Sequence, residues 1–138
     1  MSFIRKSGLV KNVQLPVTAS TAIASRALVA WSSGKLIAAT SSTAAASIAG
    51  VLVKAITASD ADYADERLVD VEVPVEKFVE YEADVTSGLV ATDRGLYQDI
   101  TDASTVNRAA STYDVVQCIR VISATKGRFF LNIGGAGA

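Results

Sequence analysis

The feature that most constrains the fold is an alternation of apolar and acidic residues along 69–85. The first run places Val69, Val71, Val73 and Val75 on one side, with Asp70, Glu72 and Pro74 between them, and the second does the same with Val79, Tyr81, Ala83 and Val85 around Glu80, Glu82 and Asp84. Successive side chains of a strand point to opposite faces, whereas a helix would scatter these valines around its circumference. The pattern predicts two half-buried strands with an apolar inner face and a charged outer face, separated near Pro74 and Glu76-Lys77.

Other segments predict further short strands. A short apolar alternation ending near a proline indicates an edge strand at 12–17. Segments 27–31 and 35–38 flank Ser32-Ser33-Gly34 and predict a hairpin, because glycine supplies the positive φ of a tight turn. β-Branched residues favour a strand at 48–57, with a short helix across 42–50 as the competing interpretation. The remaining strand candidates are 96–100, 105–108, 114–122 and 128–133, the last two joined by 123–127.

These segments define a mainly β protein. We expect a compact barrel or β-tulip/sandwich of about seven to nine short strands with at most one short helix. With 138 residues, the chain suffices for one domain with a genuine core. Residues 1–17 are expected to form an extended N-terminal arm, and 18–133 the β domain. Of the arm, residues 1 to about 12 are expected to be ordered only if something else supplies their contacts. Residues 134–138 are a Gly/Ala-rich C-terminal tail.

Residue composition excludes several kinds of chemistry. The chain has one cysteine, Cys118, and no histidine. An intramolecular disulfide is therefore impossible, and the usual zinc sites and histidine acid/base catalysis are excluded. We expect neither a metal nor another cofactor, and no enzymatic activity.

Charge and hydropathy argue against membranes and nucleic acids as partners. The N-terminal stretch carries Arg5, Lys6 and Lys11 without a continuous apolar segment, and the apolar stretch 36–58 is interrupted by Ser, Thr and Lys54. Neither a secretory signal nor a transmembrane helix is expected, so we expect a soluble intracellular product. Net charge is −1, and the acids concentrate in 60–84, leaving no basic patch of the kind that binds DNA or RNA.

The most site-like cluster is Asp60-x-Asp62-x-x-Asp65-Glu66, whose carboxylates could bind a hard cation. The spacing fails the EF-hand pattern, because an aspartate stands where that loop requires glycine and Val71 where it requires its last glutamate. A solvated acidic loop is the favoured interpretation, and whether any metal binds 60–66 stays open.

Three other patterns have a plainer structural interpretation. The Ser32-x-x-Lys35 spacing occurs in acyl-transfer enzymes, but here it falls in a predicted hairpin turn. Glu80 and Glu82 could imitate a glycosidase pair, yet they share a predicted solvent-facing ladder of acids. Cys118 lies in a predicted strand, where a single cysteine is typically a small apolar core residue. Trp31 lies beside a turn, which favours a role as a barrel plug or a contact anchor.

Three parts of the chain carry a resemblance to a known family. They are Val73-Pro-Val75, the run Leu89-Val-Ala-Thr-Asp-Arg-Gly-Leu-Tyr97, and the stretch from Val106-Asn-Arg through Gln-Cys-Ile-Arg-Val121 followed by 129–133. This pattern of strands and turns, over about 25–133, resembles the small head decoration (cement) proteins of tailed bacteriophages. Those proteins carry a "Val-x-Val-Pro" strand, a turn leading into an aromatic strand, and a closing hairpin. This chain departs from them at Asp93-Arg94-Gly95, where a Gly-Asp turn is common.

The resemblance implies a structural virion protein, made in the host bacterial cytoplasm, that lies on the outer capsid surface and stabilises the mature head. It also implies binding to the major capsid protein, frequent trimers, and an N-terminal arm that adds to a capsid sheet. A segment that adds backbone hydrogen bonds to a neighbouring sheet edge fits that role physically. We therefore expect the arm to make the capsid contact through Phe3, Ile4, Arg5, Lys6, Leu9, Val10, Lys11, Val13 and Leu15.

Two alternatives stay open. One is another phage structural subunit, in the tail tube, at head completion or at the fibre base. The other, less favoured, is a small hydrolase using Glu80 and Glu82.

Overall fold

The computed structural model describes residues 3–133, and within them the protein is mainly β, as predicted. This part of the chain holds eleven strands, two short 3₁₀ turns (Ala45–Ser47 and Ala91–Asp93) and no α-helix. The strands are β1 Ile4–Ser7, β2 Val10–Pro16, β3 Leu28–Ser32, β4 Lys35–Ala38, β5 Ile48–Leu52, β6 Leu68–Pro74, β7 Glu80–Val85, β8 Tyr97–Asp102, β9 Thr105–Asn107, β10 Val116–Ser123 and β11 Lys126–Leu131.

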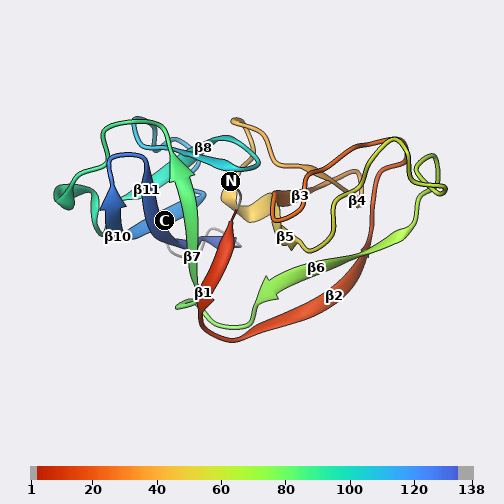
Figure 1. Ribbon diagram of the computed structural model, residues 1–138, viewed down its shortest axis with the longest axis horizontal. Helices are drawn as coiled ribbons and strands as arrows, with labels where there is room; N and C mark the ends of the chain where they lie inside the picture. Colours follow the sequence, from red (N-terminus) through yellow and green to blue (C-terminus); the bar gives the residue numbers. More distant parts are fainter. Residues whose placement is uncertain (1–2, 134–138) are drawn as a thin grey trace.

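The strands form two sheets that lie side by side (Figure 1). The first has the order β1-β7-β11-β10-β8-β9, and a parallel pairing of β9 with β7 closes five of its strands into a barrel. β1 lies outside this ring and pairs only with β7. The second sheet has the order β2-β6-β5-β3-β4, and a bridge between Val17 and Leu36 draws its two edges together.

The chain passes between the sheets at one corner, which we define as residues 8–9 and 75–79. There β1 bends into β2, and β6 bends into β7. The backbone N–H of Val75 donates to the carbonyl of Leu9 at 3.2 Å, so the two bends lie against each other. Gly8 has a φ of 100°, and a Cβ there would lie 2.7 Å from Cα of Val79. Only glycine fits this bend without displacing its neighbour.

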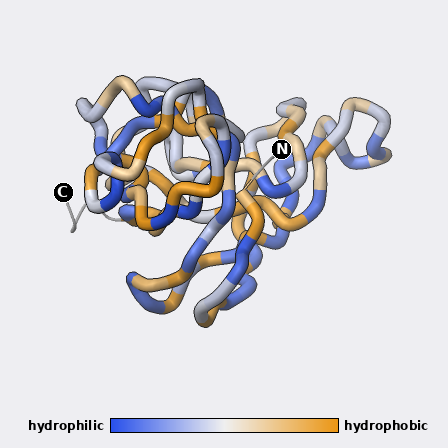
Figure 2. The backbone as a smooth tube through the Cα atoms, turned by 60° about the vertical axis from the view of Figure 1, so that its left-hand side comes forward, coloured by the Kyte–Doolittle hydropathy of each residue, from blue (hydrophilic) through white to orange (hydrophobic). Residues whose placement is uncertain are grey.

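Apolar side chains form two clusters. The larger fills the barrel and the space between the sheets, and includes Phe3, Tyr81 and Phe129, each with 0% of its surface exposed. The smaller lies within the curved second sheet around Leu36, Leu52 and other residues. The coloured tube shows apolar and polar stretches following one another along the chain in both bodies (Figure 2). Each sheet thus has a core of its own, joined at their common boundary.

Several predicted elements are confirmed. β7 alternates as expected, with Tyr81, Ala83 and Val85 buried and the acids between them partly exposed. The β3–β4 hairpin is present, and its turn residues Ser33 and Gly34 both have positive φ, at 52° and 81°. Positive φ at both central positions is characteristic of the two-residue turns that match strand twist.

The N-terminal segment differs from the prediction. Residues 4–16 are extended, but they form β1 and β2 and pair within the chain. For the described residues, the expectation that 1 to about 12 need outside contacts for their order is therefore wrong. The physical reason is that β2 pairs with β6 at every residue, from Val10 opposite Pro74 to Pro16 opposite Leu68. In addition, the side chain of Phe3 is fully buried in the core. β2 confirms the edge strand predicted at 12–17, although it begins earlier, at Val10, whereas β1 was not predicted. The eleven strands of the described residues exceed the predicted nine.

Smaller differences lie elsewhere. The strand predicted over 48–57 ends at Leu52, and the competing helix over 42–50 is reduced to the 3₁₀ turn Ala45–Ser47. The tail predicted at 134–138 lies outside the described residues, as do residues 1–2. Within the described range no helix has the length and apolar character needed to cross a bilayer.

Candidate functional site

The nine residues expected to contact a capsid separate into a buried and an exposed set. Phe3 lies in the core, while Val10 packs against the larger cluster and Leu15 against the smaller. Ile4 and Val13 are half-buried. The exposed members are Arg5, Lys6, Leu9 and Lys11. The side chains of these four lie at the surface, where another protein can reach them without unfolding the N-terminal strands.

The N-terminal strands nevertheless lie at sheet margins. β1 is the last strand of the first sheet and β2 the last strand of the second. A terminal strand leaves backbone groups on its outer side that another chain can pair with. On β2 this applies to the part before Val17, where the bridge to Leu36 begins. The same residues that were expected to reach out as an arm thus provide the outer strand of both sheets.

At the corner between these strands, apolar side chains are exposed. Leu9 and Phe78 each expose 65% of their surface, and Val75 exposes 49%. The ring of Phe78 meets that of Phe130 edge to face, with centroids 5.4 Å apart. Beside this pair lies a depression of about 320 Å³, bordered by residues that include Val75, Phe130 and Ile133. Clustered exposed apolar groups of this kind mark contact surfaces in soluble proteins.

Sequence reasoning missed most of this corner. Leu9 was included with the arm, but Phe78 was not singled out, because the Pro74 to Val79 break was interpreted only as an interruption between strands. The available signal was Phe78 itself, a large apolar residue directly after Glu76-Lys77 in a polar turn.

A buried polar cluster fixes the two sheets to each other behind the corner. Glu72 of β6 accepts hydrogen bonds at Oε2 from Nη2 of Arg26 and from the Tyr81 hydroxyl, both at 2.8 Å. Nε of Arg5 lies 3.7 Å from the other carboxylate oxygen. Nε of Arg26 also donates to the carbonyl of Phe3 at 3.1 Å. β1, β6 and β7 are therefore joined through one carboxylate.

The protonation behaviour of this cluster follows from its contacts. Burial alone would raise the pKa of Glu72, but the hydrogen bonds from Arg26 and Tyr81 and the charges of Arg26 and Arg5 outweigh it and hold that pKa below its ordinary value. Burial, and then the bond to Glu72, raises the pKa of Tyr81 far above its ordinary value. The site is a fixed ion pair with a neutral phenol, an arrangement suited to holding structure. The alternation of 69–75 predicts that Glu72 faces solvent. This prediction is wrong, because the side chain is only 8% exposed.

Three of the four acids at 60–66, namely Asp60, Asp62 and Glu66, form ion pairs within the chain. Nη2 of Arg67 lies 2.9 Å from Asp60 Oδ2, and Arg67 also pairs with Asp62. Hydrogen bonds from Arg67 and Thr57 lower the pKa of Asp60. Within residues 3–133, no group of three or more Cys, Asp or Glu side chains is arranged to hold a metal ion.

Glu80 and Glu82 lie on the outer face of β7, as predicted, and they take part in cross-strand ion pairs. Glu80 accepts a 3.0 Å hydrogen bond from Nε of Arg120 on β10 and lies 3.8 Å from Arg128 on β11. Arg128 also lies 3.6 Å from Glu82. Both carboxylates therefore take part in ion pairs with arginines of the neighbouring strands.

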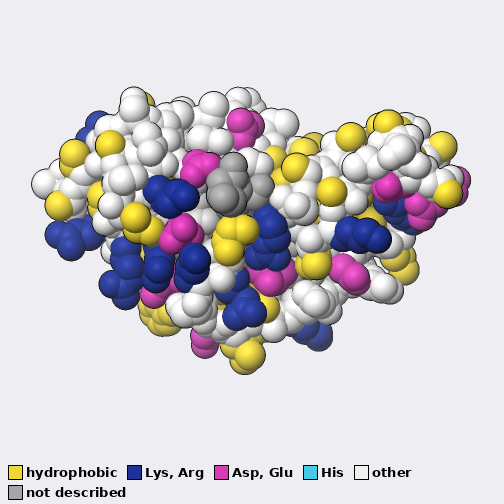
Figure 3. Space-filling model, viewed as in Figure 1, with side chains coloured by type: hydrophobic (Ala, Val, Ile, Leu, Met, Phe, Trp, Pro, Cys, Tyr) yellow, Lys and Arg dark blue, Asp and Glu magenta, His cyan; other side chains and the backbone are white. Residues whose placement is uncertain are grey.

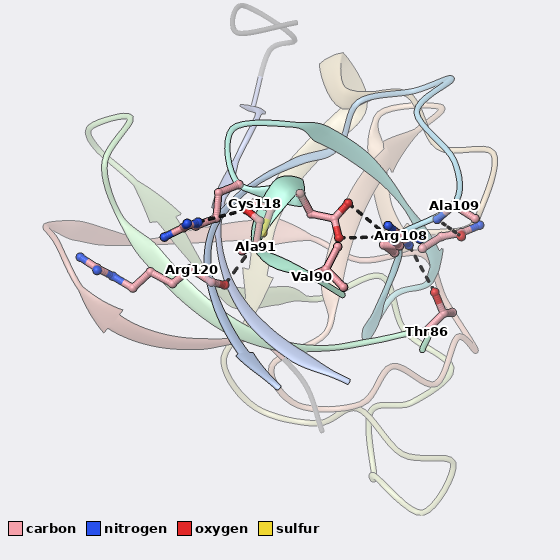
Figure 4. A network of polar contacts seen from close by, with 10 residues as sticks. Thr86, Val90, Ala91, Arg108, Ala109, Cys118 and Arg120 are labelled. Atoms are coloured by element: carbon pink, nitrogen blue, oxygen red, sulfur yellow. Dashed lines mark hydrogen bonds and ion pairs between the residues drawn. The ribbon is translucent and has the colours of Figure 1, made fainter. Parts of the chain in front are cut away.

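Cys118 is buried, as predicted, and lies near a second polar network (Figure 4). In that network the carboxylate of Asp93 accepts from the Val90 N–H at 2.8 Å and from Nε of Arg108 at 3.0 Å. Burial, followed by the negative charge of Asp93, raises the pKa of the Cys118 thiol to about 11. A thiol with a raised pKa is a poor nucleophile. The hydrogen bonds of Asp93 connect the turn Ala91–Asp93 to Arg108, in the loop that follows β9.

Two other expectations are resolved by position. The Ser32–Lys35 segment is a hairpin turn, and Lys35 pairs with Glu66. Trp31 is 39% exposed on β3, so its interpretation as a barrel plug is wrong, and its use as a contact anchor stays a prediction.

Comparison with known proteins identifies no family and no curated relative for this chain. No protein-family model matches the chain, and no curated protein is similar to it in sequence. The functional argument therefore rests on the structure and on the pattern of strands and turns described above.

Proposed function

We propose that this protein is a non-catalytic structural subunit that binds the outer surface of a tailed-phage capsid and stabilises the mature head. One observation carries the proposal: residues 4–16 form the outer strand of both sheets and meet at an exposed apolar corner. A cement protein needs a rigid module with an available strand edge, because main-chain hydrogen bonds supply affinity when a strand is added to a neighbour's sheet.

The contact surface in this proposal is the corner together with the outer sides of β1 and β2. Leu9, Val75 and Phe78 provide apolar anchors, and Lys6 and Lys11 provide a charged rim. This arrangement matches the general anatomy of protein interfaces, in which an apolar centre is surrounded by polar groups. The major capsid protein is the proposed partner, and the N-terminal strands bind it in place, without detaching.

The polar cluster supports the same role. Because Glu72 joins β1, β6 and β7, load applied at the corner is shared by both sheets. Several weakly bound copies on one shell would gain further strength through effective concentration.

The decisive experiment measures co-sedimentation with expanded phage heads assembled without this protein. The double variant Leu9→Asp and Phe78→Asp removes the apolar anchors at positions that are already 65% exposed, so the fold is retained. We expect its binding to fall by about tenfold or more. Leu96→Asp, at a position 52% exposed outside the corner, is the matched control and should bind like the wild type.

Deleting residues 1–12 is unsuitable, because it would remove β1, part of β2 and the buried Phe3. Unchanged binding by the double variant would refute the proposed surface. Imaging of labelled particles tests the location: signal over the whole shell supports a decoration protein, and signal at a single vertex supports a tail or head-completion subunit instead.

A further inference from the structure

The two ends of the long axis of the molecule differ in charge. At the barrel end, β10 and the turn Ala91–Asp93 border an open groove. At the other end, the loop between β5 and β6 projects from the second sheet (Figure 1). In the space-filling view, several basic side chains lie over the barrel with acidic ones among them, and a group of acidic side chains lies at the projecting end beside basic ones (Figure 3).

The arginine groove, as we name it, is lined by Arg94, Arg120 and Arg128 together with apolar residues that include Ile119 and Ile122. Its volume is about 610 Å³, within the range of sites that hold several side chains. Ile122 is 49% exposed, which leaves apolar surface on the floor. Among the residues that the structure describes, no carboxylate lines the groove.

The charge of the groove is only partly balanced from its surroundings. Glu80 pairs with Arg120 and Arg128, and Glu82 pairs with Arg128. Arg94 donates to the Ala91 carbonyl at 3.1 Å, and no carboxylate in the described part of the chain forms an ion pair with it. The excess positive charge is therefore concentrated at Arg94, on the exposed rim.

The acidic loop, which we define as residues 57–67, is held in one conformation. Its turns are closed by backbone hydrogen bonds from Asp60 to Thr57 and from Asp65 to Asp62, both 3.0 Å long. Arg67 connects Asp60 and Asp62, as described above. A segment that is already ordered loses little conformational entropy when it binds.

The acidic loop also carries charge that is not balanced locally. It contains Asp60, Asp62, Asp65 and Glu66 against the single basic residue Arg67, while Glu66 pairs with Lys35 from the neighbouring hairpin. Asp65 is exposed and, among the residues described, has no ion-pair partner. Ala61 and Ala64 are also exposed on this loop and could face the apolar floor of a groove.

From these observations we infer that the acidic loop of one copy docks into the arginine groove of a second copy, head to tail. Asp65 meets Arg94, and the small apolar side chains of the loop face Ile122. Because the two surfaces are different and lie at opposite ends of the molecule, the contact is heterologous and can repeat into a ring or an open row. The inference goes beyond the proposed function, since it concerns contacts between copies and not contacts with a shell.

The test is the oligomeric state of the full chain, measured by sedimentation velocity over a concentration series. The wild type should associate at low ionic strength, and added salt should weaken the association, because exposed charges are screened. Arg94→Glu and Asp65→Arg should each raise the dissociation constant by about tenfold or more, because each places like charges opposite one another. Both positions are exposed, so folding is retained, which circular dichroism verifies.

Mixing the two variants supplies the specific readout. In the mixture, the unchanged loop of the Arg94→Glu variant meets the unchanged groove of the Asp65→Arg variant. The two substituted surfaces also attract each other, because the charge at each of these positions has been reversed. Association should therefore return in the mixture and in the double variant, although each single variant alone is impaired. Thr101→Glu, which adds a charge at an exposed position of β8 outside the arginine groove and the acidic loop, should associate like the wild type.

A wild-type chain that stays monomeric at high concentration and low salt would overturn the inference, and so would an absence of rescue on mixing. Failure of the capsid proposal would look different, because the Leu9→Asp and Phe78→Asp variant would then still bind heads while self-association was unaffected.

Discussion

The hydroxyl of Tyr81 donates a 2.8 Å hydrogen bond to Oε2 of Glu72, joining β7 of the barrel to β6 of the neighbouring sheet. Tyr81 is fully buried and Glu72 nearly so. The bond therefore lies between the two bodies of the molecule, where water cannot replace it, and it converts two adjacent sheets into one unit.

Removal of this carboxylate should be costly. Glu72→Gln leaves the guanidinium of Arg26 partly buried without its counter-charge, so we expect a loss of about 3 kcal/mol in the free energy of unfolding. Tyr81→Phe, which removes one hydrogen bond to a charged group, should cost about 2 kcal/mol. Urea denaturation measures both. Asp70→Asn, on an exposed position of the same strand, should change stability by less than about 0.5 kcal/mol.

The free energy of unfolding should depend on pH through Glu72. The pKa of Glu72 is lower in the folded protein than its ordinary value of 4.5, so the folded state favours the ionised form. Its contribution is fully present above pH 4.5 and is lost as pH falls through the lower folded-state pKa. Unfolding free energies measured on either side of pH 4.5 should therefore decline toward acid, and less steeply in Glu72→Gln than in the wild type. Equal slopes would contradict this assignment.

The bend at Gly8 gives a test of the corner. Gly8→Ala imposes both a positive φ and a Cβ placed 2.7 Å from Cα of Val79, so we expect a loss of about 3 kcal/mol. Gly95→Ala is the matched control, because Gly95 also has a positive φ, of 88°, but nothing lies within 4 Å of its added Cβ. That variant should lose only about 1 kcal/mol. Equal losses in thermal or urea unfolding would show that the close approach to Val79 is unimportant.

Cys118 should be unreactive in the native protein. Its side chain is fully buried and its pKa is raised to about 11, so at pH 7 only about one molecule in ten thousand carries the thiolate. Labelling with a thiol reagent should be slow in buffer and fast in denaturant. Rapid native labelling would mean that β10 opens far more readily than its pairing with β8 and β11 implies.

Local patterns were sufficient to predict much of the strand content. The alternation at 79–85, the Ser-Gly turn at 33–34 and the β-branched runs before and after residue 125 all formed as expected, because each depends on neighbours in sequence. Segments whose structure depends on distant partners were harder. β1 has no alternating pattern of its own and is ordered by β7. The apolar alternation of β2 predicted a strand only from residue 12, and its full length is ordered by β6. Both partner strands come much later in the chain.

In the candidate site too, local features were predictable from the sequence and contacts between distant segments were not. Exposed charges on the N-terminal segment could be identified from sequence, but the burial of Glu72 could not, because it depends on Arg26 and Tyr81 approaching from separate parts of the chain. Phe78 became visible as a surface residue only once its turn was seen to lie beside Leu9.

The position of β7 between β1 and β11 has a consequence for synthesis. Along most of its length β7 pairs with β1 and β11, the first and the last strands of the described chain. The second sheet, by contrast, consists of β2 to β6 and is complete in sequence at Pro74. On the ribosome, the second sheet can assemble while the barrel residues are still being translated, whereas the barrel must wait for β11. Premature termination anywhere before residue 126 should yield half a molecule with one side of β7 uncovered, a species prone to aggregate and to be degraded.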